Sequence, residues 1–343
     1  MTPKVAVVTP TYRHAGLLGA CIASVLNQTF ADWEMVIVDD GSDDGTAEVA
    51  ESYSDPRISV IRRAHRGLAG LGESYSTALS RTTAPLVAVL EGDDMWPAAK
   101  LEIQTKLMEE DPTAVLSYGP ALLIDDQGVP YALHRHVPRG PKAMNRPLGS
   151  IIPPLIKTDF LVTSTVMIRR RALESIGGFV QPAGIPYVDL PTWLRLATEG
   201  PFARGDQVLG YWRRHSQQWT IQNVFGAGPD RRPYLLEAAA RARPLLSPRE
   251  WSRLTRSIQA DPARQQQESA ISRGRLALID GRWMEATAIW RHLLLTGEIR
   301  TTAVAGVGLA CSAARTDLEW VIRLAGRHSY PSRRHLRSRP RPE

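Results

Sequence analysis

The 343-residue sequence has few cysteines and no long apolar run. Two cysteines, Cys21 and Cys311, are too few for the disulfide framework of a small secreted domain. Because both lie in apolar segments, we expect buried thiols in a reducing compartment. No run approaches the ~18–20 apolar residues that cross a bilayer, and Met1 to Lys4 carry no leader-like pattern. We therefore expect a cytoplasmic protein.

The sequence also lacks the motif Gly-x-Gly-x-x-Gly after its first apolar run, where Pro10-Thr11-Tyr12 stands instead. This absence argues against a dinucleotide-binding oxidoreductase. A sugar nucleotidyltransferase would need a glycine-rich loop with arginine or lysine at the same place, so it remains only an alternative. No nucleic-acid-binding motif accompanies the basic residues, and we expect no nucleic-acid partner.

The net charge of +7 is unevenly distributed. Residues 1–230 contain 21 Lys and Arg against 25 Asp and Glu, whereas residues 231–343 contain 21 against 10. The basic C-terminal third suits an acidic membrane surface or an anionic acceptor. Residues 327–343 hold few core-forming side chains, so we predict a disordered basic tail there.

Apolar strands alternate with amphipathic helices over the first part of the chain. Strands are predicted over 4–9, 33–38, 58–61 and 86–90, with helices over about 15–27 and from Pro97 to about Glu110. This alternation predicts an α/β fold with an open, mostly parallel sheet and helices on both faces. Further on, we predict strands over 115–118, 121–124, 163–168 and 208–213, with a long loop over 134–154.

From about Pro233 the alternation stops. Five helices are predicted, over 235–242, 248–258, 270–279, 283–294 and 303–313. The spacing of Gly274 and Gly281 allows a helical-hairpin repeat, but a plain helical bundle is the favoured interpretation. We therefore predict an α/β domain over 1–228, a smaller all-α domain over 229–326 and the basic tail over 327–343.

Polar side chains follow three of the predicted strands at their carboxyl ends. They are Pro10 and Tyr12, then Asp39 and Asp40, then Glu91, Asp93 and Asp94. In open α/β sheets, ligands bind outside the carboxyl ends of the strands. Three carboxylates in four positions repel one another unless a cation neutralises them, and oxygen ligands suit Mg²⁺ or Mn²⁺. The sequence thus predicts a metal site that holds a phosphate-bearing substrate, and a solvated acidic turn is the alternative.

Residues 4–216 resemble a family 2 glycosyltransferase with the GT-A fold. The resemblance rests on segments that stand in family order: Val8 to Arg13, Val25 to Phe30, Val38 to Thr46, Glu91 to Trp96, Gly177-Gly178-Phe179, Asp189 before Trp193 to Leu196, and Tyr211 to His215. Each segment alone is weak evidence, but together they form a specific pattern. The helical C-terminal third lies outside the resemblance.

The resemblance implies a donor nucleotide site at the first strand ends. Pro10 and Tyr12 would form the wall on which the base rests, since base–aromatic stacking contributes ~1–3 kcal/mol. Asp40 would accept a hydrogen bond from N3–H of uracil, whereas Asp39 would serve the turn. Further donor contacts would come from Arg13, Arg66, Glu91 and Asp93, with Arg213 or Arg214 available to the diphosphate.

The resemblance also implies a metal and a base. Asp94 would bind Mn²⁺ or Mg²⁺ with help from Asp93, and His215 would lie beside the metal and diphosphate. Asp189 would be the base that takes the proton of the acceptor hydroxyl. The sequence departs from the family pattern in three places. Glu91 replaces the commoner Asp, and Val188 replaces a Glu. The segment from His65-Arg66-Gly67 to Glu73-Ser74-Tyr75 replaces the Asn before Gly and the Ala-Arg-Asn-like run of the family.

The sequence therefore predicts an inverting, metal-dependent glycosyltransferase. It would transfer a sugar from a nucleotide diphosphate donor, most simply a UDP-sugar, to a hydroxyl of a saccharide or lipid-linked acceptor. Bacterial surface polysaccharide or glycolipid synthesis is the expected setting, with peripheral contact at the inner membrane face through the basic C-terminus. A non-catalytic sugar-nucleotide-binding module is an alternative, because of the three departures.

Overall fold

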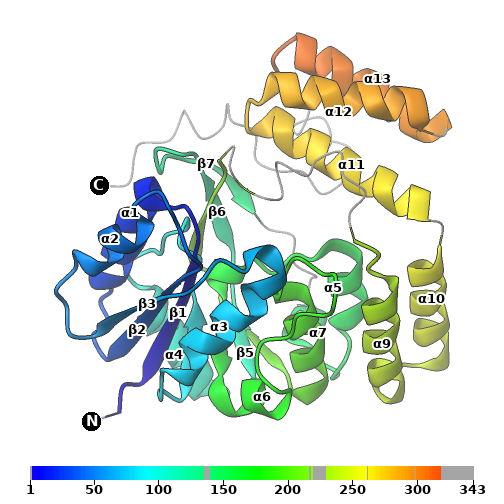
Figure 1. Ribbon diagram of the computed structural model, residues 1–343. Coiled ribbons are helices and arrows are strands. Elements are labelled where there is room, and N and C mark those ends of the chain that lie inside the picture. The colour runs from blue at the N-terminus through cyan, green and yellow to red at the C-terminus, as the bar shows by residue number, and fades with distance from the viewer. Residues whose placement is uncertain are drawn as a thin grey trace. The chain divides into compact units, whose positions relative to one another are not determined.

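The computed structural model describes residues 2–134, 140–215, 218, 229–260, 262–297 and 299–317 (Figure 1). Contacts between residues divide the chain into two compact units. The first contains Met1–Ala121, His136–Trp212 and Pro229–Thr255, and the second contains Leu122–Arg135, Arg213–Gly228 and Arg256–Glu343. Residues 229–255 thus group with the first unit. The predicted domain division at residue 228 stays a prediction, and the predicted tail lies outside the described residues.

A seven-stranded, mostly parallel sheet forms the centre of the first unit, as predicted. Its strand order is β3-β2-β1-β4-β8-β5-β9, in which β8 runs antiparallel to both of its neighbours. A second sheet has the order β10-β6-β7. The strands are β1 (Val5–Thr11), β2 (Trp33–Asp39), β3 (Ile58–Arg62), β4 (Leu86–Val89), β5 (Leu116–Tyr118), β6 (Ala121–Ile124), β7 (Pro130–His134), β8 (Met167–Arg169), β9 (Phe202–Arg204) and β10 (Gly210–Arg213).

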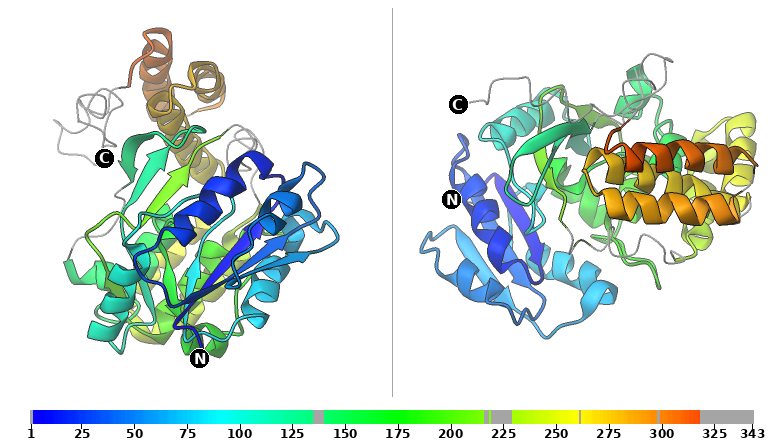
Figure 2. Two further views of the ribbon diagram at one scale, coloured as in Figure 1. Left: turned by 90° about the vertical axis from the view of Figure 1, so that its left-hand side faces the viewer. Right: turned by 90° about the horizontal axis from the view of Figure 1, so that it is seen from above.

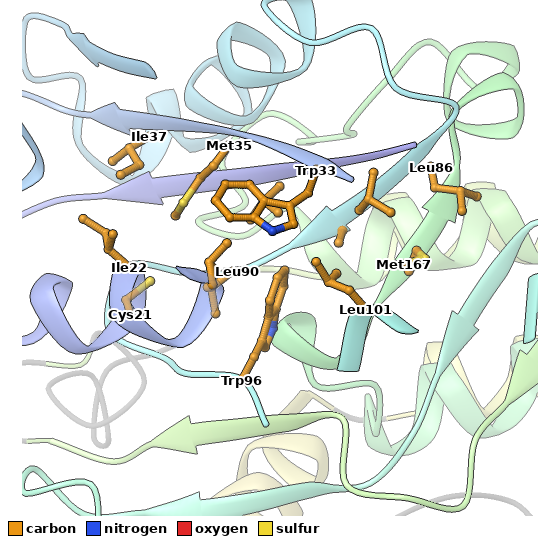
Figure 3. Close-up of a cluster of buried hydrophobic side chains, with 14 of the residues drawn as sticks. Cys21, Ile22, Trp33, Met35, Ile37, Leu86, Leu90, Trp96, Leu101 and Met167 are labelled. Atoms are coloured by element: carbon orange, nitrogen blue, oxygen red, sulfur yellow. The ribbon is translucent and has the colours of Figure 1, made fainter. Parts of the chain in front are cut away.

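Helices cover both faces of the large sheet. Because both faces are buried, the central strands are apolar at consecutive positions. All seven residues of β1 are buried. Helix α3 packs on β1 and β2 (Figures 1 and 2). Helices α1 and α4 contribute to a core with alternate residues of the strands, shown in Figure 3, where Cys21 and Ile22 lie near Met35, Ile37 and Leu90. These helices span Ala15–Leu26 (α1), Thr46–Glu51 (α2), Leu71–Ser80 (α3) and Lys100–Glu110 (α4).

The rest of the first unit is more helical than the sequence predicted. The predicted loop over 134–154 contains a 3₁₀ turn, η2, and the start of α5, with proline in the first turn of that helix. Helix α9 packs against α5 and α7. The bounds are η1 (Gly67–Gly70), η2 (Gly140–Met144), α5 (Ile152–Thr158), η3 (Thr163–Thr165), α6 (Arg170–Ser175), α7 (Asp189–Glu199), α9 (Arg232–Ala242), η4 (Arg243–Leu245) and α10 (Pro248–Gln259), the last of which runs into the second unit.

Helices α11 (Pro262–Ile279), α12 (Trp283–Thr296) and α13 (Ile299–Ala313) pack together in the second unit. Their core centres on Trp290, which is buried. Two glycines allow this packing, since a Cβ on Gly274 or Gly308 would lie 2.5 or 2.2 Å from the Trp290 ring. Gly281 has a φ of +71° in the turn between α11 and α12, which only glycine adopts without strain. Together with α9 and α10, these three helices confirm the five helices predicted after residue 233.

Two predictions about element bounds are wrong. Helix α4 begins at Lys100 and not at Pro97, because residues that follow α1 bind the carbonyl groups before Lys100. Gln28 Nε2 donates to the backbone oxygen of Pro97 (2.9 Å), and Thr29 N donates to that of Ala98 (2.9 Å). The predicted strand over 163–168 is shorter, because residues 163–165 form η3 and only Met167–Arg169 pair as β8. Strands β7 and β9 were not predicted.

Both thiols are buried, as the sequence predicted. Cys21 and Cys311, which both lie in the described part of the chain, are buried and form no disulfide. Among the described residues, every helix is too short or too polar to span a membrane.

Candidate active site

The ends of β1, β2 and β4 bring the predicted site residues to one edge of the large sheet. These strands are adjacent and parallel, with β1 in the middle. The backbone N–H of Asp40 donates to the carbonyl oxygen of Thr11 (3.0 Å), and that of Gly92 donates to the carbonyl oxygen of Pro10 (3.2 Å). These hydrogen bonds connect the loops that follow the three strands. The strand order reverses between β1 and β4, and such a switch point is where open α/β sheets bind ligands.

Tyr12 and Asp40 lie close together, and His65 joins them. The Tyr12 and His65 rings stack with centroids 4.1 Å apart. His65 Nδ1 lies 3.0 Å from Asp40 Oδ2, which also accepts hydrogen bonds from the backbone N–H groups of Arg66 (3.1 Å) and Gly67 (3.0 Å). The 65–67 segment, where the sequence departs from the family pattern, therefore packs on the carboxylate predicted to read the base. A carboxylate has about four acceptor positions, so further bonds to Asp40 are available.

The neighbouring turn explains Asp39 and Arg13. Asp39 accepts hydrogen bonds from the backbone N–H (3.1 Å) and the hydroxyl of Ser42, so it serves the turn, in keeping with its expected role. Arg13 is exposed, has a φ of +53°, and donates from Nε to Asp43 Oδ1 (2.7 Å). Its predicted contact with the donor stays a prediction, as does that of Arg66, whose side chain is also exposed.

Glu91, Asp93 and Asp94 converge after β4. One carboxylate oxygen from each lies within 4.8 Å of the other two, and Asp93 and Asp94 are buried. Such a set of oxygen ligands fits Mg²⁺ or Mn²⁺. Asp94 accepts a hydrogen bond from the Ser164 hydroxyl, and Tyr75 Oη donates to Glu91 Oε1 (3.1 Å). Burial and the charges of Asp93 and Asp189 raise the pKa of Glu91 to about 8, and a bound cation would lower it.

Asp189 is the first residue of α7 and reaches the same edge. Its Oδ2 accepts a hydrogen bond from Thr163 Oγ1 (3.4 Å). Burial raises the pKa of Asp189, opposed by the Leu190 N–H group and by the positive charge of Arg231. Because Thr163 binds Asp189 and the adjacent Ser164 binds Asp94, η3 anchors the predicted base and the predicted metal ligand side by side.

The chain passes into the second unit at Arg213, the last residue of β10. Arg213 is buried, and its Nη1 donates to the backbone carbonyl oxygens of Asp125 (3.0 Å) and Asp126 (2.9 Å). Arg214 Nε lies 3.7 Å from Asp280 Oδ2. The predicted place of His215 beside the metal stays a prediction.

Comparison with known proteins decides the family. The model of the family "Glycosyl transferase family 2" matches residues 6–177, half of the chain. The chain belongs to glycosyl transferase family 2. It is thus a glycosyltransferase, and the predicted membership is confirmed.

Curated relatives of this family 2 glycosyltransferase come from several bacteria. The putative teichuronic acid biosynthesis glycosyltransferase TuaG of Bacillus subtilis is 33% identical over 205 residues, which cover 59% of this chain and 75% of TuaG. The Escherichia coli protein WfgD, a UDP-Glc:alpha-D-GlcNAc-diphosphoundecaprenol beta-1,3-glucosyltransferase, is 33% identical over 36% of this chain and 48% of its own. The chain thus matches about half of WfgD.

Solved structures confirm the GT-A-type fold. S. aureus TarS in complex with UDP-GlcNAc has a TM-score of 0.60 at 15% identity, over 95% of this chain and 93% of that chain. The mannosyltransferase PcManGT from Pyrobaculum calidifontis, in complex with GDP-Man and Mn²⁺, has a TM-score of 0.53 at 18% identity, over 96% and 89%.

Several residues at the site of this glycosyltransferase were missed from sequence. Thr163 and Ser164 were assigned to a strand, and no role was predicted for Tyr75. The only signal was the run Thr163-Ser164-Thr165, three consecutive hydroxyls in an otherwise apolar segment. A hollow of about 770 Å³ lies on another part of the glycosyltransferase, where Ser76, Ser80 and Gln181 are among its lining residues. None of the predicted site residues lines it.

Proposed function

We propose that this glycosyltransferase is inverting and metal-dependent, and that it uses a UDP-sugar. The observation that carries the proposal is the pairing of acids on η3, where Ser164 binds Asp94 and Thr163 binds Asp189. One acid suits a cation beside a diphosphate, and the other suits a proton acceptor on the sugar side. Asp94 follows β4, which pairs with β1 at the switch point of the sheet, and Tyr12 follows β1.

The donor base would rest near Tyr12 and Asp40. A carboxylate accepts the N3–H of uracil, and Asp40 keeps acceptor capacity beyond its bonds to the 65–67 segment. Pro10, Arg13 and Arg66 would complete the nucleotide contacts, with Glu91 and Asp93 near the ribose. The TarS complex with UDP-GlcNAc supports a uridine donor, whereas the PcManGT complex contains GDP-Man, so guanine is the alternative base.

Asp94 and Asp93 would hold the divalent cation, with His215 as the third predicted ligand. When bound, Mn²⁺ or Mg²⁺ neutralises the charge that develops on the leaving nucleoside diphosphate. Glu91 completes the group of acids. Tyr75, which donates a hydrogen bond to Glu91, fixes the orientation of that carboxyl group.

Asp189 would act on the acceptor. The acceptor hydroxyl oxygen attacks the anomeric carbon from the face opposite the diphosphate, the bond from that carbon to the diphosphate oxygen breaks, and the hydroxyl proton passes to Asp189. Single displacement inverts the anomeric configuration. The raised pKa of Asp189 makes it a stronger base than an exposed aspartate.

The names of the relatives favour surface polysaccharide or glycolipid synthesis in bacteria. We infer a saccharide or lipid-linked acceptor. We also infer that the basic C-terminal residues contact the cytoplasmic face of the inner membrane. The alternative is a module that binds a sugar nucleotide without transfer, which the departures at Glu91, Val188 and 65–75 would favour.

The proposal is tested by a thermal-shift panel of UDP, UMP, GDP, CDP and ADP, each with Mn²⁺, with Mg²⁺ and with EDTA. A ligand at 100 times its Kd stabilises by ~2.7 kcal/mol, and each kcal/mol raises Tm by roughly 2–4 °C in a domain of this size. We expect UDP with Mn²⁺ to raise Tm by several degrees, and UDP with EDTA or UMP with Mn²⁺ to do much less. A larger shift with GDP, or equal shifts with Mn²⁺ and EDTA, would overturn the uridine or the metal assignment.

A further inference from the structure

Arg231, the N-cap residue of α9, supplies a cation on a helix that packs against α7, whose first residue is Asp189, although α9 lies beyond the residues that match the family model. Arg231 is the N-cap residue of α9 and is partly buried where α9 packs against α5 and α7. A positive charge at a helix N-terminus is unfavourable, because the helix dipole has its positive end there. Stabilisation of α9 therefore does not explain the arginine. The next residue, Arg232, is different, since it forms an exposed ion pair with Asp230 (2.8 Å).

Two tyrosines hold the Arg231 side chain. Arg231 Nε donates to Tyr234 Oη (3.1 Å), which lies 3.0 Å from Tyr187 Oη. The guanidinium carbon is 5.9 Å from the centroid of the Tyr187 ring. Among the described residues, no carboxylate lies within ion-pair distance of Arg231. Its charge therefore acts on the neighbouring acids across a gap and not through direct contact.

Three buried polar atoms in this region have no hydrogen-bond partner among the described residues. They belong to three charged side chains and are Asp159 Oδ1, Asp189 Oδ1 and Arg231 Nη2. Buried polar atoms are nearly always hydrogen-bonded in folded proteins, so three such atoms together indicate a place for a polar ligand. Asp159 follows α5 with a φ of +37°, in the left-handed region that is strained for a residue with a side chain.

The charge of Arg231 acts on both carboxyl groups. Burial and the charge of Asp189 raise the pKa of Asp159 well above its ordinary range, whereas Arg231 lowers it. The pKa of Asp189 is also raised by burial, but the Leu190 N–H group and Arg231 oppose this. The other titratable groups that interact with Asp189 are Glu91, Tyr75 and Tyr187.

We propose that Arg231, held by Tyr234 and Tyr187, is a positioning residue whose positive charge acts on Asp189, so that α9 belongs to the active site. The inference rests on the proposed function, in which Asp189 is the base. It extends the active site beyond the region recognised by the family model.

The test compares Arg231→Gln with Arg232→Gln, a matched change at the next position of α9. We expect Arg231→Gln to keep the UDP-induced rise in Tm but to lower turnover at neutral pH by roughly 10-fold, less than the 10²- to 10⁴-fold effect of a general base. Removing the cation raises the pKa of Asp189, so the acid limb of the kcat/KM profile moves to higher pH. Arg231→Lys restores the limb toward its original position, and Arg232→Gln leaves it unchanged.

A carboxyl ¹³C NMR titration of Asp189 gives a readout without turnover. The inference predicts a higher pKa for Asp189 in Arg231→Gln than in the wild type, and no change in Arg232→Gln. If Arg231→Gln lowers Tm or activity while the limb and the NMR pKa stay in place, the arginine is structural and the inference is wrong. If the wild type turns over no donor, the proposed function fails, and the titration alone then decides whether Arg231 acts on Asp189.

Discussion

Replacing Asp189 with asparagine is expected to lower sugar transfer by about 10³-fold while UDP binding is retained. Loss of a positioned general base costs 10²- to 10⁴-fold, and asparagine copies the shape of the side chain without its basicity. The hydrogen bond from Thr163 Oγ1 persists, because the amide oxygen of asparagine also accepts. The measurement is the release of UDP from a UDP-sugar in the presence of acceptor, together with the UDP-induced change in Tm.

Asp206→Asn is the matched control, since Asp206 is an exposed aspartate of the same unit (86% exposed). Its transfer rate should equal that of the wild type. A rate in Asp189→Asn within a few-fold of the wild type would remove Asp189 from the base role. Intact UDP binding with no transfer in either protein would instead favour the non-catalytic module.

Asp94→Asn is expected to remove the metal dependence of nucleotide binding. Asp94 is buried within the group of three acids, and a neutral amide is a weaker ligand for a hard cation than a carboxylate. Without the cation, the developing charge of the diphosphate is stabilised less, and the loss of one such interaction costs about 10²- to 10³-fold. We expect transfer to fall by that factor and the Mn²⁺-dependent part of the UDP-induced Tm shift to disappear.

The control for this change is Asp55→Asn, which removes an acid that pairs with Arg57 away from the sheet edge. Both variants should fold, because asparagine at position 94 can still accept from the Ser164 hydroxyl. Equal Mn²⁺ dependence in Asp94→Asn and the wild type would show that Asp94 does not bind the metal.

Local sequence predicted the parts of the fold that depend on consecutive residues. The buried strands were recognisable because both faces of the sheet are covered, which makes positions such as Val5, Val7 and Val8 apolar in succession. Strands β7 and β9 were missed. β9 has only three residues, and the first residue of β7 is an exposed proline. Such short segments carry no periodicity that separates a strand from a loop.

The candidate site was predictable where chemistry follows a strand end. The acids after β2 and β4 lie at one edge because parallel neighbouring strands end there, which topology alone implies. The hydrogen bonds from Ser164 to Asp94 and from Thr163 to Asp189 join residues 70 and 26 positions apart, so they depend on tertiary packing. The same holds for Arg231, which no motif in the sequence marks and which precedes a helix that packs against α7.

The central claim is that one sheet edge binds a uridine diphosphate through Tyr12, Asp40 and a cation on Asp94. The most direct measurement is a crystal structure of the protein with UDP and Mn²⁺. We expect the uracil ring against Tyr12 with N3–H on Asp40, and Mn²⁺ between Asp94 and the diphosphate. Electron density for UDP elsewhere, such as in the hollow lined by Ser76 and Gln181, or Mn²⁺ bound away from Asp94, would contradict the account.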